Sequence, residues 1–294
     1  MIEQLFQFIG DWHTQTIAHG DNQPLLVDQT IKAAIAQRFK QFCITDHYPL
    51  PPNFIDPTKA QDCSMVSDMY FGIYLQTIKN SQRTYSEKID VRRGAEFDWL
   101  PDYQQWTQEQ INIQQFDFCI GSIHFLKDPK RKYWILDYTE DEFLKVVEAF
   151  GGIKNLVTAY YQEVRNMVQS GLFNSIGHID LIKKYSAADK PLFSEQDEWY
   201  KNEVNRTLDL IAQSKMSMEI NTSGLQKKCK STYPSQWILD LANKKQIGLT
   251  IGSDAHKPEE IGRDLDKALN MSLLAGYNSI NVYQKRQKIP ISIK

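Results

Sequence analysis

Short apolar runs alternate with longer amphipathic stretches along most of the chain. The runs are rich in β-branched and aromatic residues, which is typical of strands, whereas the stretches between them have the periodicity of helices with one apolar face. Seven strands are predicted, at Phe8–His13, Phe42–Asp46, Ile89–Glu96, Phe116–Ile123, Phe173–Ile179, Met216–Asn221 and Ile247–Ser253. Helices are predicted at Asp28–Phe39, Met65–Ser81, Tyr103–Gln115, Glu140–Ser170 (broken at Gly151-Gly152), Glu195–Ser214, Pro234–Lys244 and Ile261–Leu274. This alternation predicts the α/β class, with parallel strands joined by crossover helices.

A single domain is expected over residues 1–294. This length exceeds that of the usual domain, but α/β barrels commonly form one unit of about 200–250 residues or more. The sequence has no Gly/Ser-rich linker, low-complexity tract or shift in composition that would mark a second domain. A long loop rich in Pro, Asp and Asn is predicted at Pro49–Ser64, and on the catalytic face of a barrel such a loop can act as a lid.

The overall charge gives no reason to expect a nucleic-acid or membrane partner. The chain has 34 Lys and Arg residues and 36 Asp and Glu residues, which gives a net charge of −2. Cys43, Cys63, Cys119 and Cys229 form no Cys-x-x-Cys pair, which favours reduced, mostly buried thiols over disulfides or a zinc ribbon. The N-terminus lacks the basic region and cleavage site of a signal peptide. We therefore expect a cytoplasmic enzyme.

Five of the six histidines stand at or just beyond the carboxyl end of a predicted strand. They are His13, His47, His124, His178 and His256, and His19 follows in the first loop. A histidine taken alone is more often a structural or surface residue. Because a barrel brings its strand ends together, five histidines at equivalent places predict one shared site.

Carboxylates accompany these histidines. They occur in Asp11-Trp-His13, Asp46-His47, Glu96-Phe-Asp98, His178-Ile-Asp180 and Asp254-Ala-His256. Imidazole nitrogen mixed with carboxylate oxygen suits zinc, iron or manganese better than magnesium or calcium. In Asp-x-His at a strand end, both side chains point to the same face, so one can bind a metal while the other orients it. We assign the orienting role on the remote nitrogen of His13 to Asp11.

Seven motifs resemble, in order, those of the polymerase-and-histidinol-phosphatase (PHP) superfamily, and most closely its histidinol-phosphate phosphatase branch. They are DWHTQT at 11–16, TDH at 45–47, GAEFDW at 94–99, GSIHF at 121–125, GHIDLIKK at 177–184, EINTSGL at 219–225 and GSDAH at 252–256. A single His-x-His or Asp-x-His would be weak evidence, whereas seven ordered motifs are specific. The resemblance extends from Asp11 to Gly262 and covers most of the chain.

The resemblance implies a distorted seven-stranded (β/α) barrel, of the type related to TIM barrels, with a site for two or three divalent ions. By motif position, the first ion would be held by His13, Gln15, Glu96 and Asp254, the second by Glu96, His124 and His178, and the third by His19, His47 and His256. Glu96 would bridge the first two ions. The implied reaction is hydrolysis of a phosphomonoester by a metal-bound hydroxide, with Asp254, His256 and Glu96 as the catalytic residues.

Basic residues near these motifs are candidates for binding the substrate phosphate. The family commonly presents Lys or Arg there, which favours Lys183, Lys227 and Arg165, with Lys184, Lys228 and Arg263 as alternatives. Surface lysines are an equally good explanation of such Lys-Lys pairs. An amine on the substrate could be recognised by an acidic residue, for which the candidates are Asp98, Asp180 and Glu219.

The first motif departs from the family pattern in two ways. The expected Asp-x-His-x-His is Asp11-x-His13-x-Gln15, and His19 follows His13 by six residues where eight is more usual. A neutral amide oxygen is a weaker ligand than an imidazole. Natural variation with retained activity, an engineered inactivation and a natural loss of catalysis would each account for Gln15.

Three functions are compatible with these observations. The first is hydrolysis of L-histidinol phosphate in histidine biosynthesis. The second is a related phosphoesterase with another substrate, such as a nucleotide or a nucleic-acid end, although the balanced charge argues against long nucleic acids. The third is a catalytically disabled protein that binds metal or ligand, which Gln15 suggests.

Overall fold

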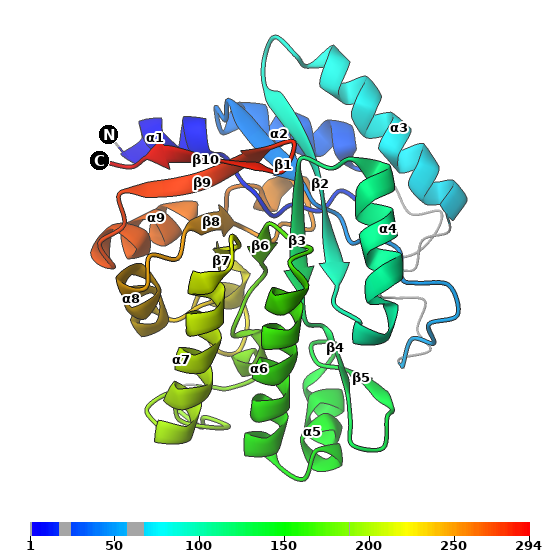
Figure 1. Cartoon of the computed structure of the whole chain (residues 1–294). Coiled ribbons are helices and arrows are strands. Elements are labelled where there is room, and N and C mark those ends of the chain that lie inside the picture. Colours follow the sequence, from blue (N-terminus) through cyan, green and yellow to red (C-terminus); the bar gives the residue numbers. More distant parts are fainter. Residues whose placement is uncertain (1, 18–24, 58–67, 188) are drawn as a thin grey trace.

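The chain forms a curled, six-stranded parallel sheet with helices packed around it (Figure 1). The computed structural model describes residues 2–17, 25–57, 68–187 and 189–294. The sheet contains β1 (Gln41–Ile44), β2 (Asp90–Asp98), β3 (Phe118–Ser122), β6 (Ser175–Ile176), β7 (Ser217–Asn221) and β8 (Leu249–Gly252), hydrogen-bonded in that order. Neighbouring strands in this sheet all pair in parallel, so the predicted α/β class is confirmed.

The first predicted strand, Phe8–His13, is wrong. Helix α1 (Ile2–Ile9) includes its first two residues, because IEQLFQFI has apolar residues at the first, fourth, fifth and eighth positions, which is helical spacing. The extended residues 11–14 follow, without forming a regular strand. The Trp12 amide donates to the Ile251 carbonyl (3.1 Å) and the Cys43 amide donates to the Asp11 carbonyl (2.9 Å). Residues 11–14 thus hydrogen-bond to both edges of the sheet, β8 and β1.

Helices connect the strands of the sheet. They are α2 (Val27–Ala36), α3 (Asp68–Thr84), α4 (Gln104–Gln114), α5 (Glu140–Ala149), α6 (Ile153–Ser170), α7 (Glu198–Gln213), α8 (Gln236–Lys244) and α9 (Leu265–Leu274), with short 3-10 turns η1 (Pro101–Tyr103), η2 (Leu181–Lys183), η3 (Ser223–Gln226) and η4 (Pro258–Glu260). The predicted break at Gly151-Gly152 is confirmed. Both glycines have positive φ, 72° and 119°, which ends α5 before α6 begins. None of the helices in the described part of the chain is long and apolar enough to span a membrane.

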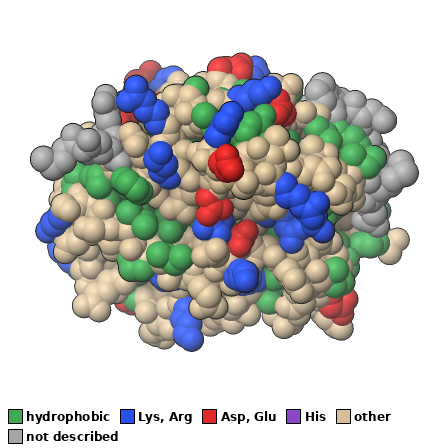
Figure 2. All heavy atoms as spheres, turned by 90° about the horizontal axis from the view of Figure 1, so that it is seen from above, with side chains coloured by type: hydrophobic (Ala, Val, Ile, Leu, Met, Phe, Trp, Pro, Cys, Tyr) green, Lys and Arg blue, Asp and Glu red, His purple; other side chains and the backbone are tan. Residues whose placement is uncertain are grey.

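Two hairpins that the sequence did not indicate complete the fold. One consists of β4 (Phe125–Lys127) and β5 (Tyr133–Ile135), and the other of β9 (Ser279–Gln284) and β10 (Gln287–Ser292). Tyr283 of β9 packs against Phe118 and Trp12, with ring centroids 4.9 and 6.3 Å away. The second hairpin therefore covers the end of the sheet where the strands begin. Figure 2 shows this end of the molecule, where acidic and basic side chains are interspersed.

The predicted loop Pro49–Ser64 is described only as far as residue 57, and its remainder lies outside the described residues. Residues 49–57 contain no helix or strand. Phe54 packs against Phe125 and Tyr133, with ring centroids 5.1 Å away in each case, which fixes this part of the loop on the β4–β5 hairpin.

The cysteines in the described part of the chain are free thiols, as the sequence predicted. Cys43 and Cys119 are buried and Cys229 is half-buried, whereas Cys63 lies outside the described residues. Burial raises the pKa of Cys119 to about 12. These buried thiols are packing residues.

Asp11 joins residues 11–14 to the loop that follows β8. Its carboxylate is fully buried and accepts hydrogen bonds from the Ser253 amide (2.9 Å), the Ser253 hydroxyl (2.5 Å) and the Gly262 amide (2.9 Å). Burial raises the pKa of Asp11, and these hydrogen bonds oppose that effect. The carboxylate therefore holds the loop that carries Asp254 and His256 against the N-terminal segment.

We expect Asp11→Ala to lower the free energy of unfolding by about 3 kcal/mol or more, because it leaves several buried donors without an acceptor. Urea denaturation followed by circular dichroism measures this change. Glu87→Ala, at an exposed position, is the control and should change stability by less than about 0.5 kcal/mol. Equal stability of the two variants would contradict the role of Asp11.

Candidate active site

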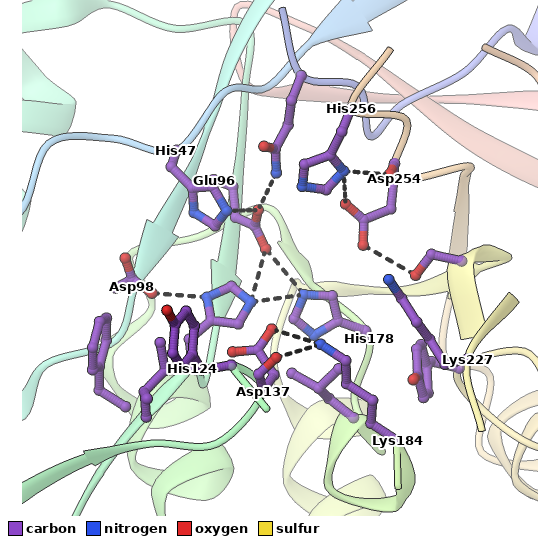
Figure 3. Close-up of a pocket in the computed structure, with 17 residues that line it drawn as sticks. His47, Glu96, Asp98, His124, Asp137, His178, Lys184, Lys227, Asp254 and His256 are labelled. Carbon is purple, nitrogen blue, oxygen red and sulfur yellow. Dashed lines mark hydrogen bonds and ion pairs between the residues drawn. The ribbon is translucent and has the colours of Figure 1, made fainter. Parts of the chain in front are cut away.

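A cavity of about 220 Å³ lies where the parallel strands end, and most of the predicted site residues line it (Figure 3). Its polar lining includes Gln15, His47, Glu96, Asp98, His124, Asp137, His178, Lys184, Lys227, Asp254 and His256. His13 is fully buried and contacts the same carboxylates. The predicted convergence of strand-end histidines is therefore what the structure shows. His19 lies outside the described residues.

Glu96, at the end of β2, is the centre of the cluster. Its Oε2 lies 3.0 Å from His13 Nε2 and 3.5 Å from His47 Nε2. Its Oε1 lies 3.0 Å from His178 Nε2 and 3.6 Å from His124 Nε2. Four imidazoles from different segments thus share one carboxylate that is only 1% exposed.

Glu219, and not Asp11, contacts Nδ1 of His13, the ring nitrogen that is turned away from Glu96. His13 Nδ1 and Glu219 Oε1 are 2.7 Å apart, which directs Nε2 toward Glu96. The other oxygen of Glu219 accepts a hydrogen bond from the His178 amide (2.9 Å). Glu219 is therefore committed to two segments of the site, and the prediction that it binds a substrate amine is wrong.

Asp98 contacts Nδ1 of His124, as Glu219 contacts Nδ1 of His13. His124 Nδ1 lies 2.8 Å from Asp98 Oδ1, and its Nε2 lies 3.2 Å from His178 Nε2. Two ring nitrogens this close together need a cation or proton between them, because their lone pairs otherwise repel. Asp98 thus contacts an imidazole through Oδ1, and its predicted contact to a substrate amine stays a prediction.

Asp254 and His256 lie on the loop after β8. Asp254 has φ of 55°, the left-handed region, and its Oδ2 accepts hydrogen bonds from Asn221 Nδ2 (3.2 Å) and Ser223 Oγ (3.1 Å). Such backbone strain is typical of functional residues that their surroundings hold in place. His256 is 44% exposed at the rim, with Nδ1 2.9 Å from the Asp254 carbonyl oxygen.

Gln15 points into the site and does not turn away from it. Its backbone amide donates to the Ala255 carbonyl (2.7 Å), and its side-chain Nε2 donates to Glu96 Oε2 at 3.4 Å. The side chain is 2% exposed. The amide therefore occupies the position that the family pattern gives to an imidazole.

The cluster carries negative charge that attracts cations. Burial alone would raise the pKa of Glu96, but His13, His47 and His124 outweigh burial and hold it well below its usual range. Burial would lower the pKa of His124, but Glu96 and Asp137 outweigh burial and raise it to about 10. Positive charge is therefore needed beside the buried carboxylates, and divalent ions can supply it.

Two groups of ligand atoms among the described residues have the spacing of a metal site. They are Glu96, His124 and His178, and His47, Asp98 and His124, with the ligand atoms of each group within 4.8 Å of one another. Imidazole nitrogen with carboxylate oxygen fits zinc, iron or manganese. The residues thus fit divalent ions, as the sequence predicted.

Two of the three basic residues predicted to bind phosphate do not line this cavity. Lys183 is buried, with its Nζ 2.7 Å from Asp180 Oδ2 and 2.5 Å from Ser235 Oγ. Arg165 is buried too, and its guanidinium donates to Glu203 Oε2 at 2.8 Å. The buried ion pair also removes Asp180 from the candidates for binding an amine.

Lys184 and Lys227 do line the cavity. The 3-10 turn η2 explains why Lys184, and not its neighbour Lys183, faces the site. The turn directs Lys183 toward Asp180 and leaves Lys184 on the other side. Lys228 and Arg263 lie outside the cavity and pair with Glu140 (2.6 Å) and Glu260 (2.9 Å).

Some residues of the cavity had no signal in the sequence. Asp137 and Tyr138 follow the three-residue strand β5, which is too short for its periodicity to be recognised. Tyr233 lines the cavity next to a cis peptide bond at Pro234. The sequence between the predicted strands gave no reason to place either segment at the strand ends.

A sequence model of the PHP domain matches residues 12–223, which is more than half of the chain. The chain belongs to the PHP family. The histidinol-phosphatase of Bacillus subtilis is 30% identical to this PHP protein over 260 residues, which cover 86% of this chain and 94% of the relative.

Two solved structures resemble this PHP protein along most of its length. A Listeria monocytogenes protein, provisionally assigned as a histidinol phosphatase, has a TM-score of 0.76 and 25% identity, and the match covers 87% of this chain and 98% of that one. The histidinol phosphate phosphatase of Lactococcus lactis, solved with zinc, L-histidinol and phosphate, has a TM-score of 0.71 and 19% identity, with 96% and 99% covered.

Gly252 permits the close approach of His13 and Glu219. A Cβ at this position would lie 2.4 Å from the Cβ of His13 and 2.6 Å from Glu219 Oε1. We expect Gly252→Ala to displace His13, to lower the free energy of unfolding by about 1–3 kcal/mol and to reduce the bound metal. Denaturation and elemental analysis measure both effects.

Gly72→Ala is the matched control, because a Cβ there meets no atom within 4 Å and the residue lies in α3. That variant should keep its metal and gain stability. If Gly252→Ala behaves in the same way, His13 and Glu219 are not packed as described.

Proposed function

We propose that this PHP protein is a metal-dependent phosphomonoesterase that hydrolyses L-histidinol phosphate to L-histidinol and phosphate, as a step of histidine biosynthesis in the cytoplasm. The observation that carries the proposal is Glu96, a buried carboxylate shared by four imidazoles at the base of a small cavity. The assignment of the Bacillus subtilis relative as a histidinol-phosphatase, over 94% of its length, supports the substrate. A cavity of about 220 Å³ suits a small molecule better than a nucleic acid.

The metal ligands follow from the contacts of the cluster. Glu96, His124 and His178 would hold one ion, and His47, Asp98 and His124 could hold a second. A third position is formed by His13, Gln15, Asp254 and Glu96. His19 and His256 complete the family set.

Residues 11–14 take the place of the seventh barrel strand, because they hydrogen-bond to both edges of the sheet.

Divalent ions bound there would supply charge neutralisation for the phosphate and a water of lowered pKa, about 7, as the nucleophile. The protein supplies the acid–base groups around them. Burial would raise the pKa of Asp254, but His13 and His256 outweigh burial and lower it, so the side chain is an ionised carboxylate that holds a proton only weakly. His256 stands beside it at the rim, where a protonated ring could donate its proton to the departing alkoxide and regain one from water afterwards.

Lys184 and Lys227 are placed to bind the phosphate oxygens that the ions do not neutralise. Both line the cavity, on the side of His178 and Asp254 (Figure 3). Lys binds phosphate as a point charge, so these contacts stabilise the anion without fixing its orientation as a bidentate Arg would.

Glu96→Gln tests the metal centre. The neutral amide cannot balance bound cations, so we expect less metal per chain and turnover of L-histidinol phosphate reduced by at least about 100-fold. Elemental analysis and phosphate release measure these effects. Glu109→Gln, on the exposed side of α4, should leave both unchanged. Normal turnover by Glu96→Gln would refute the proposed centre.

Gln15→His tests whether the third metal position limits this chain. An imidazole at residue 15 is a stronger ligand than an amide, so we expect about one more ion per chain and tighter binding in metal titrations. Gln15→Asn is the control and should not add an ion. If the wild type and Gln15→His both bind metal but neither hydrolyses a phosphomonoester, the chain is a binding protein and not a phosphatase.

A further inference from the structure

A buried ion pair lies next to the active-site cavity without lining it. Lys183 Nζ is 2.7 Å from Asp180 Oδ2, and the two side chains are 3% and 0% exposed. Neither residue is among those that line the cavity. The metal and phosphate chemistry proposed above uses neither of them, so the pair needs another explanation.

Stability does not account for this pair. Taking two charges out of water costs free energy that their mutual attraction often fails to recover, so apolar side chains of similar size would stabilise the fold about as well. Apolar side chains cannot form directed hydrogen bonds, however, and both members of the pair form them. The hydrogen bonds therefore indicate what the pair does.

Both members of the pair hold Ser235. The Ser235 amide donates to Asp180 Oδ2 (3.2 Å), and the Ser235 hydroxyl accepts from Lys183 Nζ (2.5 Å). That hydroxyl in turn donates to Glu195 Oε1 at 3.0 Å. The pair thus fastens the turn η2 to segment 233–235 and to the residues before α7.

The turn that the pair fastens carries Lys184. The Lys183 amide donates to the Asp180 carbonyl at 3.1 Å, so the ion pair closes the same turn as this backbone hydrogen bond. Lys184 follows directly and enters the cavity, where its Nζ donates to the Asp137 carbonyl at 2.6 Å (Figure 3). The direction of Lys184 therefore depends on how η2 is held.

The other fastened segment has a second anchor. Tyr233 lines the cavity, and its amide and carbonyl form hydrogen bonds with the carbonyl and amide of Asn221 at 2.9 and 2.7 Å. Asn221 belongs to β7, so Tyr233 stays attached to the sheet when Ser235 is released. Loss of the ion pair should therefore displace Lys184 more than Tyr233.

We propose that Lys183 and Asp180 are positioning residues, which hold Lys184 where it contacts the phosphate group of the substrate. This inference rests on the proposed function, in which Lys184 binds phosphate oxygens. Loss of the pair should weaken phosphate binding. The metal ligands and the acid–base groups do not hang on η2, so bound metal and kcat should change little.

The competing explanation is that the pair only stabilises the fold. Removing one member would leave a buried charge without a partner and would destabilise the protein for that reason alone. Asp180→Asn/Lys183→Met removes both charges and keeps the lengths of the two side chains. Its melting temperature should stay near that of the wild type, so that a change in binding reports position and not unfolding.

The chain offers a matched control in a second buried ion pair. Arg165 and Glu203 join α6 to α7, with 2.8 Å between the charged atoms and side chains 6% and 11% exposed. Neither residue lines the cavity. Glu203→Gln/Arg165→Met should therefore leave phosphate binding and turnover unchanged.

The experiment uses the metal-loaded full chain. Calorimetric titration with inorganic phosphate gives Kd, steady-state kinetics with L-histidinol phosphate give kcat and KM, and elemental analysis gives bound metal. In Asp180→Asn/Lys183→Met we expect Kd for phosphate and KM to rise about 10- to 100-fold, because a charge-assisted contact is lost. Its kcat and bound metal should stay close to those of the wild type.

The outcomes separate this inference from the proposed function. Unchanged Kd and KM in the double variant would overturn the positioning role, and so would a parallel loss of metal and kcat. A wild type that binds phosphate but hydrolyses no phosphomonoester would overturn the phosphatase alone, since the titration still tests the pair.

Ser235→Ala decides if the double variant does not fold. It removes only the hydroxyl that joins Lys183 to Glu195. We expect a smaller rise in Kd for phosphate, about 3- to 10-fold. A Kd equal to that of the wild type would contradict the positioning role.

Discussion

The cost of burying an ionised carboxylate controls the arrangement of this site. Glu96 is 1% exposed, and a buried charge without compensation costs several kcal/mol or more. The imidazoles around it supply that compensation, and a second layer of acids, Glu219 and Asp98, fixes two of those rings. The curled sheet brings these groups together, since they come from β2, β7, the residues just after β1, β3 and β6, and the segment 11–14 beside the sheet.

The sequence predicted the members of this cluster well because their positions follow from strand periodicity. His47, Glu96, His124 and His178 each lie at or just beyond the end of a predicted strand, and parallel strands end on the same side of a sheet. The α/β class and the helix break at Gly151-Gly152 followed from equally local patterns. The position of the site at the strand ends therefore followed from the sequence.

The remaining features depend on packing between distant segments. The spacing of Asp11 and His13 favoured a contact between them, but the buried Asp11 carboxylate is used by Ser253 and Gly262, and Glu219 reaches His13 from β7. The strand predicted at Phe8–His13 was wrong because its first two residues belong to the helical pattern of Ile2–Ile9. Sequence periodicity indicates which face of a helix or strand is apolar. It does not indicate which distant side chain will form a hydrogen bond to a given residue.

The adjacent lysines at 183 and 184 have identical side chains and opposite surroundings. Lys183 is 3% exposed against Asp180, whereas Lys184 faces the cavity. Reagents that acylate amines need access to a side chain that can lose its proton. Covalent labelling of the folded protein therefore distinguishes the two neighbours, marking Lys184 and sparing Lys183, and a bound ligand in the cavity should protect the one that reacts.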